Sequence, residues 1–199
     1  MRSFPLTVFI AALALGGQAF GQDQSMSLAS STYSSFERGD GILSLSLGTT
    51  VPLGWYNPDA SAFEKANSKP GFAFALSYEG FLNQYWAIAG DLAGGFMGSI
   101  NDRRLFVAPL SVRAVRVFPL GAFTIAPTAG LGLAISALGE YKHIDPLFKA
   151  GSSVLWRASN DMSYAANIYA NVIPQIFSDS TLTRVGFFME ATLSVAYHL

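Results

Sequence analysis

The sequence contains no cysteine. This absence excludes disulfide bonds, thiol catalysis, thiolate metal sites and lipid attachment at an N-terminal cysteine. Charged residues are also scarce, at 13% of the chain against roughly 25% in soluble globular proteins. The net charge is −1, so the chain lacks the basic surface that binds nucleic acid, and we expect no nucleic-acid partner.

Long hydrophobic runs are missing too, apart from one near the N-terminus. It covers residues 5–15, follows a positively charged start and precedes small residues at Ala19 and Gly21. This order is typical of a secretory signal peptide, which we expect over residues 1–21, with cleavage after Gly21 or after Ala19. The alternative is an N-terminal membrane anchor, but the run is shorter than the roughly 17–25 residues that a spanning helix needs.

Apolar and polar residues alternate over long stretches of the chain. Hydrophobic residues make up 51% of it. From Val185 to Leu199 every second residue is apolar or aromatic, and the residues between them are mostly small or polar. This period of two predicts a strand with one apolar face over 184–199. Residues 22–40 are serine-rich and polar and predict a loose segment. Similar alternating stretches then lie at 41–52, 71–81, 85–98, 105–118, 122–136, 147–158 and 162–174.

The connections between these stretches are sorted by length. The second, fourth and sixth are tight, whereas the first, third, fifth and seventh cover 53–70, 99–104, 137–146 and 175–183. Barrels of the outer membrane have short turns on the periplasmic side and longer loops outside. We therefore predict an all-β fold, an eight-stranded antiparallel up-and-down transmembrane β-barrel over residues 41–199.

Aromatic residues on the apolar faces gather near both ends of the predicted strands. Two aromatic girdles at the membrane interfaces explain this placement better than an ordinary core does. Arg116 interrupts one apolar face near a turn, where its long side chain can reach the interface. Pro109 and Pro127 cannot donate to a ladder, so we expect bulges or kinks there. The predicted girdle residues are Phe72, Tyr78, Trp86, Phe96, Phe106, Phe118, Phe123, Phe148, Trp156, Tyr164, Phe187 and Tyr197.

The opposite faces carry polar and charged residues of both signs. Side chains just fill the interior of an eight-stranded barrel, so opposite charges there should pair. The residues leave two interpretations open: a structural plug, and a narrow path in which pairs such as Arg113 with Glu190 exchange partners. The predicted lumen network is Glu79, Asp91, Arg113, Lys149, Arg157, Asn167 and Glu190, with Tyr169 and Asn171 on the same faces.

These features together resemble a known group. An export signal, eight amphipathic strands, sorted loops and a last strand with Val195, Tyr197 and Leu199 resemble the small outer-membrane barrels of the OmpW, OmpX and OmpA-barrel type. The resemblance implies the outer membrane of a diderm bacterium, with outer-membrane lipid around the barrel and recognition of the last strand by the outer-membrane assembly machinery. The resemblance to the OmpW-like members also implies a third interpretation of the interior, a ligand cavity that opens toward the outer leaflet and binds or passes small hydrophobic solutes. Leu199 departs from the more usual terminal phenylalanine.

A surface structural or interaction protein, adhesin-like and acting through its long loops, is the alternative function. The first loop, 53–70, would carry that role. A soluble lipocalin-like barrel is the alternative fold, but its outer face should be rich in lysine and glutamate. The first-loop residues are Trp55, Tyr56, Asp59, Glu64, Lys65 and Lys69.

An enzyme is the third class. His143 is predicted in the fifth loop beside Asp145, but the sequence assigns no serine nucleophile to this pair. With two histidines and no phosphate-binding motif, we predict no catalytic residue, metal or cofactor.

Overall fold

The computed structural model describes residues 36–99, 104–139, 141–177 and 180–199. The predicted signal peptide and most of the predicted segment 22–40 lie outside the described residues. Within the described part of that segment, Gly39 N donates to Phe81 O at 3.1 Å, and the Phe36 ring stacks on Phe81 with centroids 4.1 Å apart. The described residues include no helix of the length and apolarity needed to span a bilayer.

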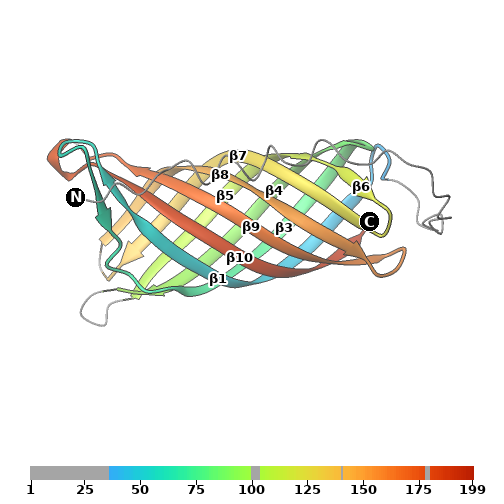
Figure 1. Ribbon diagram of the computed structural model, residues 1–199, viewed down its shortest axis with the longest axis horizontal. Helices are drawn as coiled ribbons and strands as arrows, with labels where there is room; N and C mark the ends of the chain where they lie inside the picture. Colours follow the sequence, from blue (N-terminus) through green and yellow to red (C-terminus); the bar gives the residue numbers. More distant parts are fainter. Residues whose placement is uncertain (1–35, 100–103, 140, 178–179) are drawn as a thin grey trace, which may run out of the picture. The chain divides into compact units, whose positions relative to one another are not determined.

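Within the described residues, eight long antiparallel strands form a closed barrel, as predicted (Figure 1). Neighbouring strands in the chain pair with one another, and the last pairs with the first. Figure 1 shows the strands crossing the barrel axis at a slant, as closure requires. The strands are β1 (Gly41–Asn57), β3 (Gly71–Asn83), β4 (Trp86–Gly98), β5 (Arg104–Arg116), β7 (Phe123–Leu138), β8 (Tyr141–Arg157), β9 (Met162–Gln175) and β10 (Arg184–His198).

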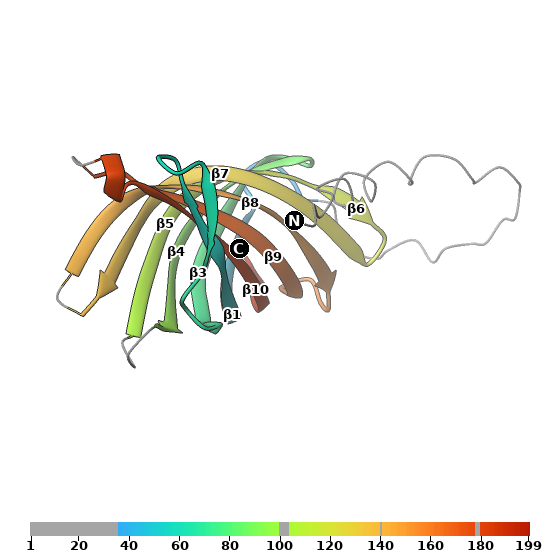
Figure 2. The same cartoon turned by 60° about the vertical axis from the view of Figure 1, so that its left-hand side comes forward.

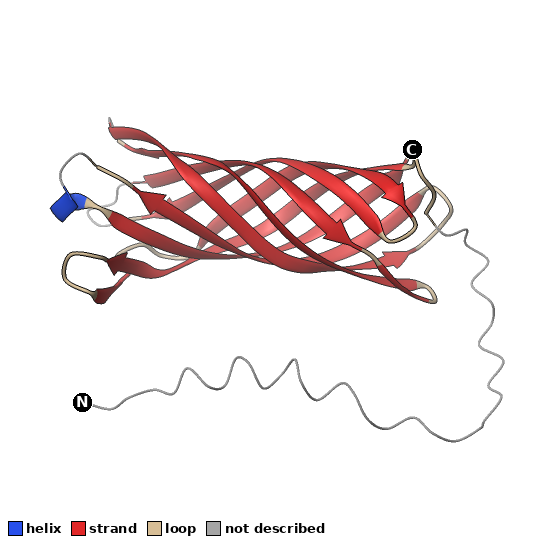
Figure 3. Ribbon diagram, turned by 90° about the horizontal axis from the view of Figure 1, so that it is seen from above, coloured by secondary structure: helices blue, strands red, loops and turns tan. Residues whose placement is uncertain are grey.

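Three short elements complete the fold. β2 (Ala62–Lys65) pairs with the end of β1, and β6 (Phe118–Leu120) pairs with β7. The 3-10 helix η3 (Ser180–Leu182) lies at the barrel end opposite the C-terminus (Figure 3). We call the end with η3 and the β1–β2 hairpin the loop end (Figure 2), and the end with the C-terminus the turn end.

The prediction of a long fifth connection over 137–146 is wrong. The ladder between β7 and β8 continues to the pair Leu138–Tyr141. His143, which the sequence placed in this loop, therefore lies on β8. Such an extension is not visible in the alternation, because the residues beyond the membrane no longer need an apolar outer face.

The first connection is also partly strand. β1 runs to Asn57, and its register against β10 shifts between Pro52 and Gly54. A shift of one residue exchanges the two faces of a strand. Trp55 consequently turns inward, where its ring lies edge-on to Phe188 with centroids 5.7 Å apart.

The bulges predicted at Pro109 and Pro127 are not found. β4 and β5 keep one register on both sides of Pro109, and β7 keeps its register against β8 through Pro127. Val117 N donates to Tyr85 O, and donors alternate along an antiparallel strand. The N–H of residue 109 would therefore face β4. Proline at this position removes that donor from the β4–β5 ladder, but the register of the two strands stays the same.

The outer surface between the girdles is apolar. Leu193 is 71% and Leu131 66% exposed, whereas the lumen-facing Lys149 is 2% exposed. All twelve predicted girdle residues lie on the outer surface, with Phe106 and Phe187 half-buried. A surface of this kind is stable in lipid and not in water.

Arg116 lies on this outer surface near the turn end. Its guanidinium carbon is 5.0 Å from the ring centroids of Tyr85 and Trp86 and 5.5 Å from that of Phe118. Aromatic faces attract a cation, so these rings hold the charge at the girdle and out of the aliphatic band.

Candidate functional site

Arg113 is the centre of a buried polar network inside the barrel. Its Nε and Nη2 donate to the two carboxylate oxygens of Asp91, at 2.6 and 2.7 Å. Its Nη1 donates to Thr128 at 3.1 Å, and Glu79 lies 3.9 Å from Nη2. The bidentate contact fixes the guanidinium plane and satisfies both oxygens of the carboxylate.

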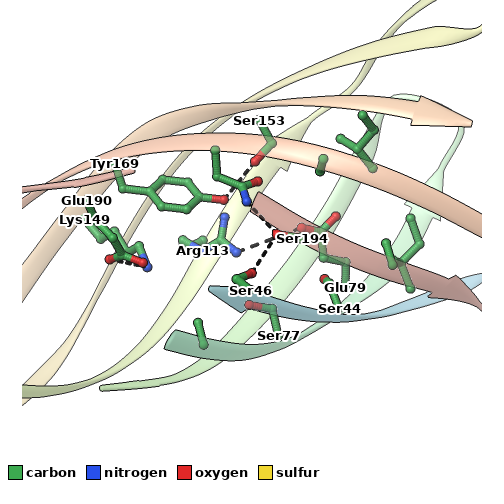
Figure 4. Close-up of a pocket in the computed structure, with 16 residues that line it drawn as sticks. Ser44, Ser46, Ser77, Glu79, Arg113, Lys149, Ser153, Tyr169, Glu190 and Ser194 are labelled. Carbon is green, nitrogen blue, oxygen red and sulfur yellow. Dashed lines mark hydrogen bonds and ion pairs between the residues drawn. The ribbon is translucent and has the colours of Figure 1, made fainter. Parts of the chain in front are cut away.

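Lys149 is the second cation of this network. Its Nζ lies 3.4 Å from Asp91 and 3.6 Å from Glu190. It also lies 4.4 Å from the ring centroid of Tyr169, whose hydroxyl shares a hydrogen bond of 2.8 Å with Ser153 (Figure 4). The predicted pair Arg113–Glu190 is therefore wrong: the ion-pair partner of Glu190 is Lys149.

Gly130 lies on the strand between the two cations. It lies directly opposite Arg113 on one side and Lys149 on the other. A Cβ at this position would lie 2.7 Å from Arg113 Cγ and 2.6 Å from Arg113 Cα. The nearest atom, closer still, would be Val112 O, so a larger residue would force the β5 backbone at Val112 and Arg113 to move.

The remaining polar residues fall into two places. Asn167 belongs to an uncharged cluster, in which its Nδ2 donates to Ser194 at 2.6 Å, and Ser194 shares a bond of 2.7 Å with Ser46. Arg157 lies apart, at the turn end, where its Nη2 is 2.9 Å from Nδ1 of His198. The structure thus brings together Glu79, Asp91, Arg113, Lys149 and Glu190, places Asn167 beside them and separates Arg157.

Apolar clusters close the described lumen on both sides of the network. At the turn end one contains Ile42, Phe81 and Val115, and at the loop end the other contains Leu147, Ile173 and Phe188, among others. The cavities at the network have volumes of about 20 Å³ each, which is roughly the space of a single water molecule. Side chains therefore fill the described lumen at the level of the network.

A much larger cavity lies at the loop end, next to the apolar cluster that contains Leu147, Ile173 and Phe188. Its volume is about 460 Å³, within the range of about 300–1,000 Å³ that is typical of small-molecule sites. We call it the mouth cavity. Sequence reasoning missed it, because its wall combines the inward turn of Trp55, the extension of β8 and the β1–β2 hairpin. Its apolar floor and walls include Trp55, Leu105, Val107, Leu138, Ile173, Phe177 and Phe188, and its polar side includes Glu64, Lys65, Lys142, His143 and Gln175.

One seam of the barrel beside the mouth cavity is not closed by backbone hydrogen bonds. The ladder between β8 and β9 ends at the pair Phe148–Val172, although β8 continues to Tyr141 and β9 to Gln175. Even-numbered residues of β8 donate to β9, as Ala158 N does to Met162 O. The next hydrogen-bonded pair would be residues 146 and 174.

Both of these residues are proline. Neither has an N–H, so the seam loses both donors at one position. Side chains bridge it instead: Gln175 Nε2 donates to Asp145 Oδ2 at 3.4 Å, and the rings of His143 and Phe177 lie 4.9 Å apart. Such contacts can separate more easily than a backbone ladder.

The histidine weighed for catalysis lines this cavity, and its aspartate partner Asp145 is buried beside it. His143 Nδ1 is 2.5 Å from Asp145 Oδ1, and Ser136 lies opposite His143 on β7. Among the described residues, however, no serine hydroxyl is within hydrogen-bonding distance of His143. The described residues also contain no group of three histidine or acidic side chains that could hold a metal ion.

Comparisons with known proteins agree with this architecture. Neisserial surface protein A is similar with a TM-score of 0.62 and 12% identity, over 80% of this chain and 96% of that one. OprG from Pseudomonas aeruginosa gives 0.52 and 11%, over 82% and 97%. Ail of Yersinia pestis, in complex with the heparin analogue sucrose octasulfate, gives 0.50 and 16%, over 81% and 99%. At these identities the likeness concerns the fold.

Sequence comparison adds one further match. Among curated proteins none matches this chain. A protein-family model matches residues 21–197, which is most of the chain and includes nearly all of the barrel. The chain therefore belongs to that family, and it is a small eight-stranded β-barrel of the outer-membrane type.

Proposed function

We propose that this protein resides in the outer membrane, binds a small hydrophobic solute in the mouth cavity and releases it sideways into the membrane through the β8–β9 seam. The observation that carries the proposal is an apolar-floored cavity of about 460 Å³ above a filled lumen. A solute in this cavity cannot continue along the axis, because the apolar cluster at the loop end and the ion-pair network occupy the path. The β8–β9 seam is a side of the cavity without a backbone ladder.

The surroundings of the seam favour this route. His143, Gln175 and Phe177 bridge the seam and line the mouth cavity as well. On the outer side of the same strands, Ile144 is 63% and Ile176 65% exposed. An apolar molecule that leaves through the seam therefore meets apolar side chains and lipid, so its transfer exposes little hydrophobic surface to water.

The test restores the missing donors. Pro146→Val with Pro174→Val returns both N–H groups, so the ladder can extend and close the seam. In intact cells, uptake of the apolar dye N-phenylnaphthylamine should rise with the wild-type protein and fall to the background level with the double variant. Pro127→Val is the matched control, because Pro127 lies on β7, away from this seam, and should leave uptake unchanged.

The outcomes separate the parts of the proposal. Unchanged uptake in the double variant would refute the lateral route. Uptake equal to that of cells lacking the protein, together with an open-channel conductance in planar bilayers, would refute the whole proposal. The alternative of an adhesin-like surface protein stays a prediction; of its first-loop residues, Trp55, Glu64 and Lys65 belong to the cavity wall.

A further inference from the structure

Two polar side chains of the mouth cavity face each other across a gap. Ser136 on β7 lies directly opposite His143 on β8, and both line the cavity. The alternation along the two strands turns both side chains inward, because their neighbours Ile135 and Ile144 are exposed on the outer surface. Residues directly opposite in an antiparallel pair have Cβ atoms about 4.5–5.5 Å apart. The serine hydroxyl and the imidazole ring therefore border one small space in the cavity wall.

Both side chains keep a polar atom free for a ligand. Ser136 is only 9% exposed, and its hydroxyl forms no hydrogen bond with the part of the chain that the structure describes. His143 uses Nδ1 for its contact with Asp145, and its Nε2 has no such partner either. A buried polar group without a hydrogen bond costs free energy, and a ligand that supplies the bond recovers that cost.

Asp145 fixes the role of the histidine. Its side chain is 1% exposed, and it also accepts a hydrogen bond from Gln175 Nε2 at 3.4 Å. Because a carboxylate only accepts, the proton of a neutral imidazole lies on Nδ1, and Nε2 of His143 is an acceptor. The Ser136 hydroxyl can donate. A hydroxyl group on a ligand satisfies both, because its single oxygen donates one hydrogen bond and accepts another.

The neighbours of this polar pair are apolar. Val107 lies directly opposite Ser136 on β5, and Val107 and Phe188 line the cavity together. Resting on the binding function proposed above, we infer that the preferred solute is a hydrophobic alcohol whose hydroxyl bridges Ser136 and His143. Its apolar body lies on Val107 and Phe188. An alkane of the same length would leave both polar atoms without a partner.

Trp55 offers a reporter inside the cavity. The other two tryptophans, Trp86 and Trp156, lie on the outer surface at 44% and 48% exposure. With Trp86→Phe and Trp156→Phe, the emission of the protein in lipid nanodiscs comes from Trp55 alone. Bromine on a ligand tail quenches tryptophan at short range, so bromodecanol, bromodecane and bromodecanoate compare a hydroxyl, no polar group and a carboxylate on one tail.

Each probe is compared between variants, because its partition into the lipid is the same for all of them. Ser136→Ala should raise the bromodecanol concentration for half-maximal quenching by about three- to tenfold, as expected for one lost hydrogen bond, and leave bromodecane unchanged. Ser136→Thr keeps a hydroxyl and should bind bromodecanol like the wild type. Ser68→Ala is the matched control, because it removes a hydroxyl from another part of the same cavity lining. It should leave all three probes unchanged.

A second variant tests the histidine. His143→Phe with Asp145→Asn removes the Nε2 acceptor, keeps a ring beside Phe177 and leaves no buried carboxylate without its partner. Bromodecanol should again weaken by about three- to tenfold, and bromodecane should stay unchanged.

The possible failures are distinguishable. If Ser136→Ala leaves bromodecanol unchanged, weakens bromodecane equally or acts on bromodecanoate alone, the alcohol inference is overturned and the proposed binding of hydrophobic solutes stands. If none of the three probes quenches Trp55 saturably, the proposed function itself is refuted, and this inference with it.

Discussion

Replacing Arg113 by methionine removes the main partner of Asp91 and keeps only an unbranched apolar side chain in place of the arginine stem. The two side chains are 2% and 0% exposed, and two hydrogen bonds of 2.6 and 2.7 Å join them. In the variant, Asp91 retains Ser111 at 3.0 Å and Lys149 at 3.4 Å. The carboxylate thus stays buried with weaker compensation.

The expected loss follows from this burial. Breaking a buried ion pair by removing one partner costs about 3–5 kcal/mol, because the other charge stays desolvated. Lys149 offsets part of this cost, so we expect the free energy of unfolding to fall by about 3 kcal/mol. Arg184→Met makes the same chemical change in the pair with Glu64, where the side chains are 27% and 49% exposed. That control should lose about 0–1 kcal/mol.

A double-mutant cycle separates pairing from packing. Asp91→Asn keeps the shape of the side chain and removes its charge, so the combination with Arg113→Met leaves no buried anion at this position. Relative to Arg113→Met, the double variant should lose at most about 1 kcal/mol of further stability. The coupling energy between the two positions should be about 2–3 kcal/mol.

Equilibrium unfolding by urea in lipid vesicles, followed by tryptophan fluorescence, measures the four proteins of the cycle and the Arg184→Met control under one condition. Additive effects, with Arg113→Met losing no more than Arg184→Met, would refute the reasoning. Such a result would mean that the lumen charges are solvated, and the lumen would then not be the plug described above.

Two further predictions use the same unfolding assay. Gly130→Ala should lose about 1–3 kcal/mol by displacing the β5 backbone at Val112 and Arg113, whereas Gly90→Ala, where a Cβ meets nothing within 4 Å, should change the stability by less than about 0.5 kcal/mol. Leu92→Arg introduces a charge into the aliphatic band and should lose about 2–4 kcal/mol. Arg116→Leu removes only the contacts with the girdle rings and should lose about 1 kcal/mol; equal losses for these two would contradict the placement of the girdle.

The sequence predicted the strands well because their signal is local. A strand that faces lipid on one side and the lumen on the other must alternate, and β10 shows this from Val185 to Tyr197. The alternation of apolar and polar residues is weaker at the loop end. There His143 was read as a loop residue, although β8 begins at Tyr141.

Local sequence patterns could not predict which side chains pair with one another inside the barrel. Whether Glu190 meets Arg113 or Lys149 depends on the tilt and register of several strands at once. The facing prolines are a second example: Pro146 and Pro174 are unremarkable in the chain, and only the register of β8 against β9 places both missing donors at one position.

The amino-acid sequence by itself determined the eight amphipathic strands and which of their residues face inward and outward, because the two media act on each strand separately. The tertiary structure alone decided the ion pairs of the lumen, the seam between β8 and β9 and the mouth cavity. These features join side chains from distant strands, so they exist only after the barrel has closed in one register.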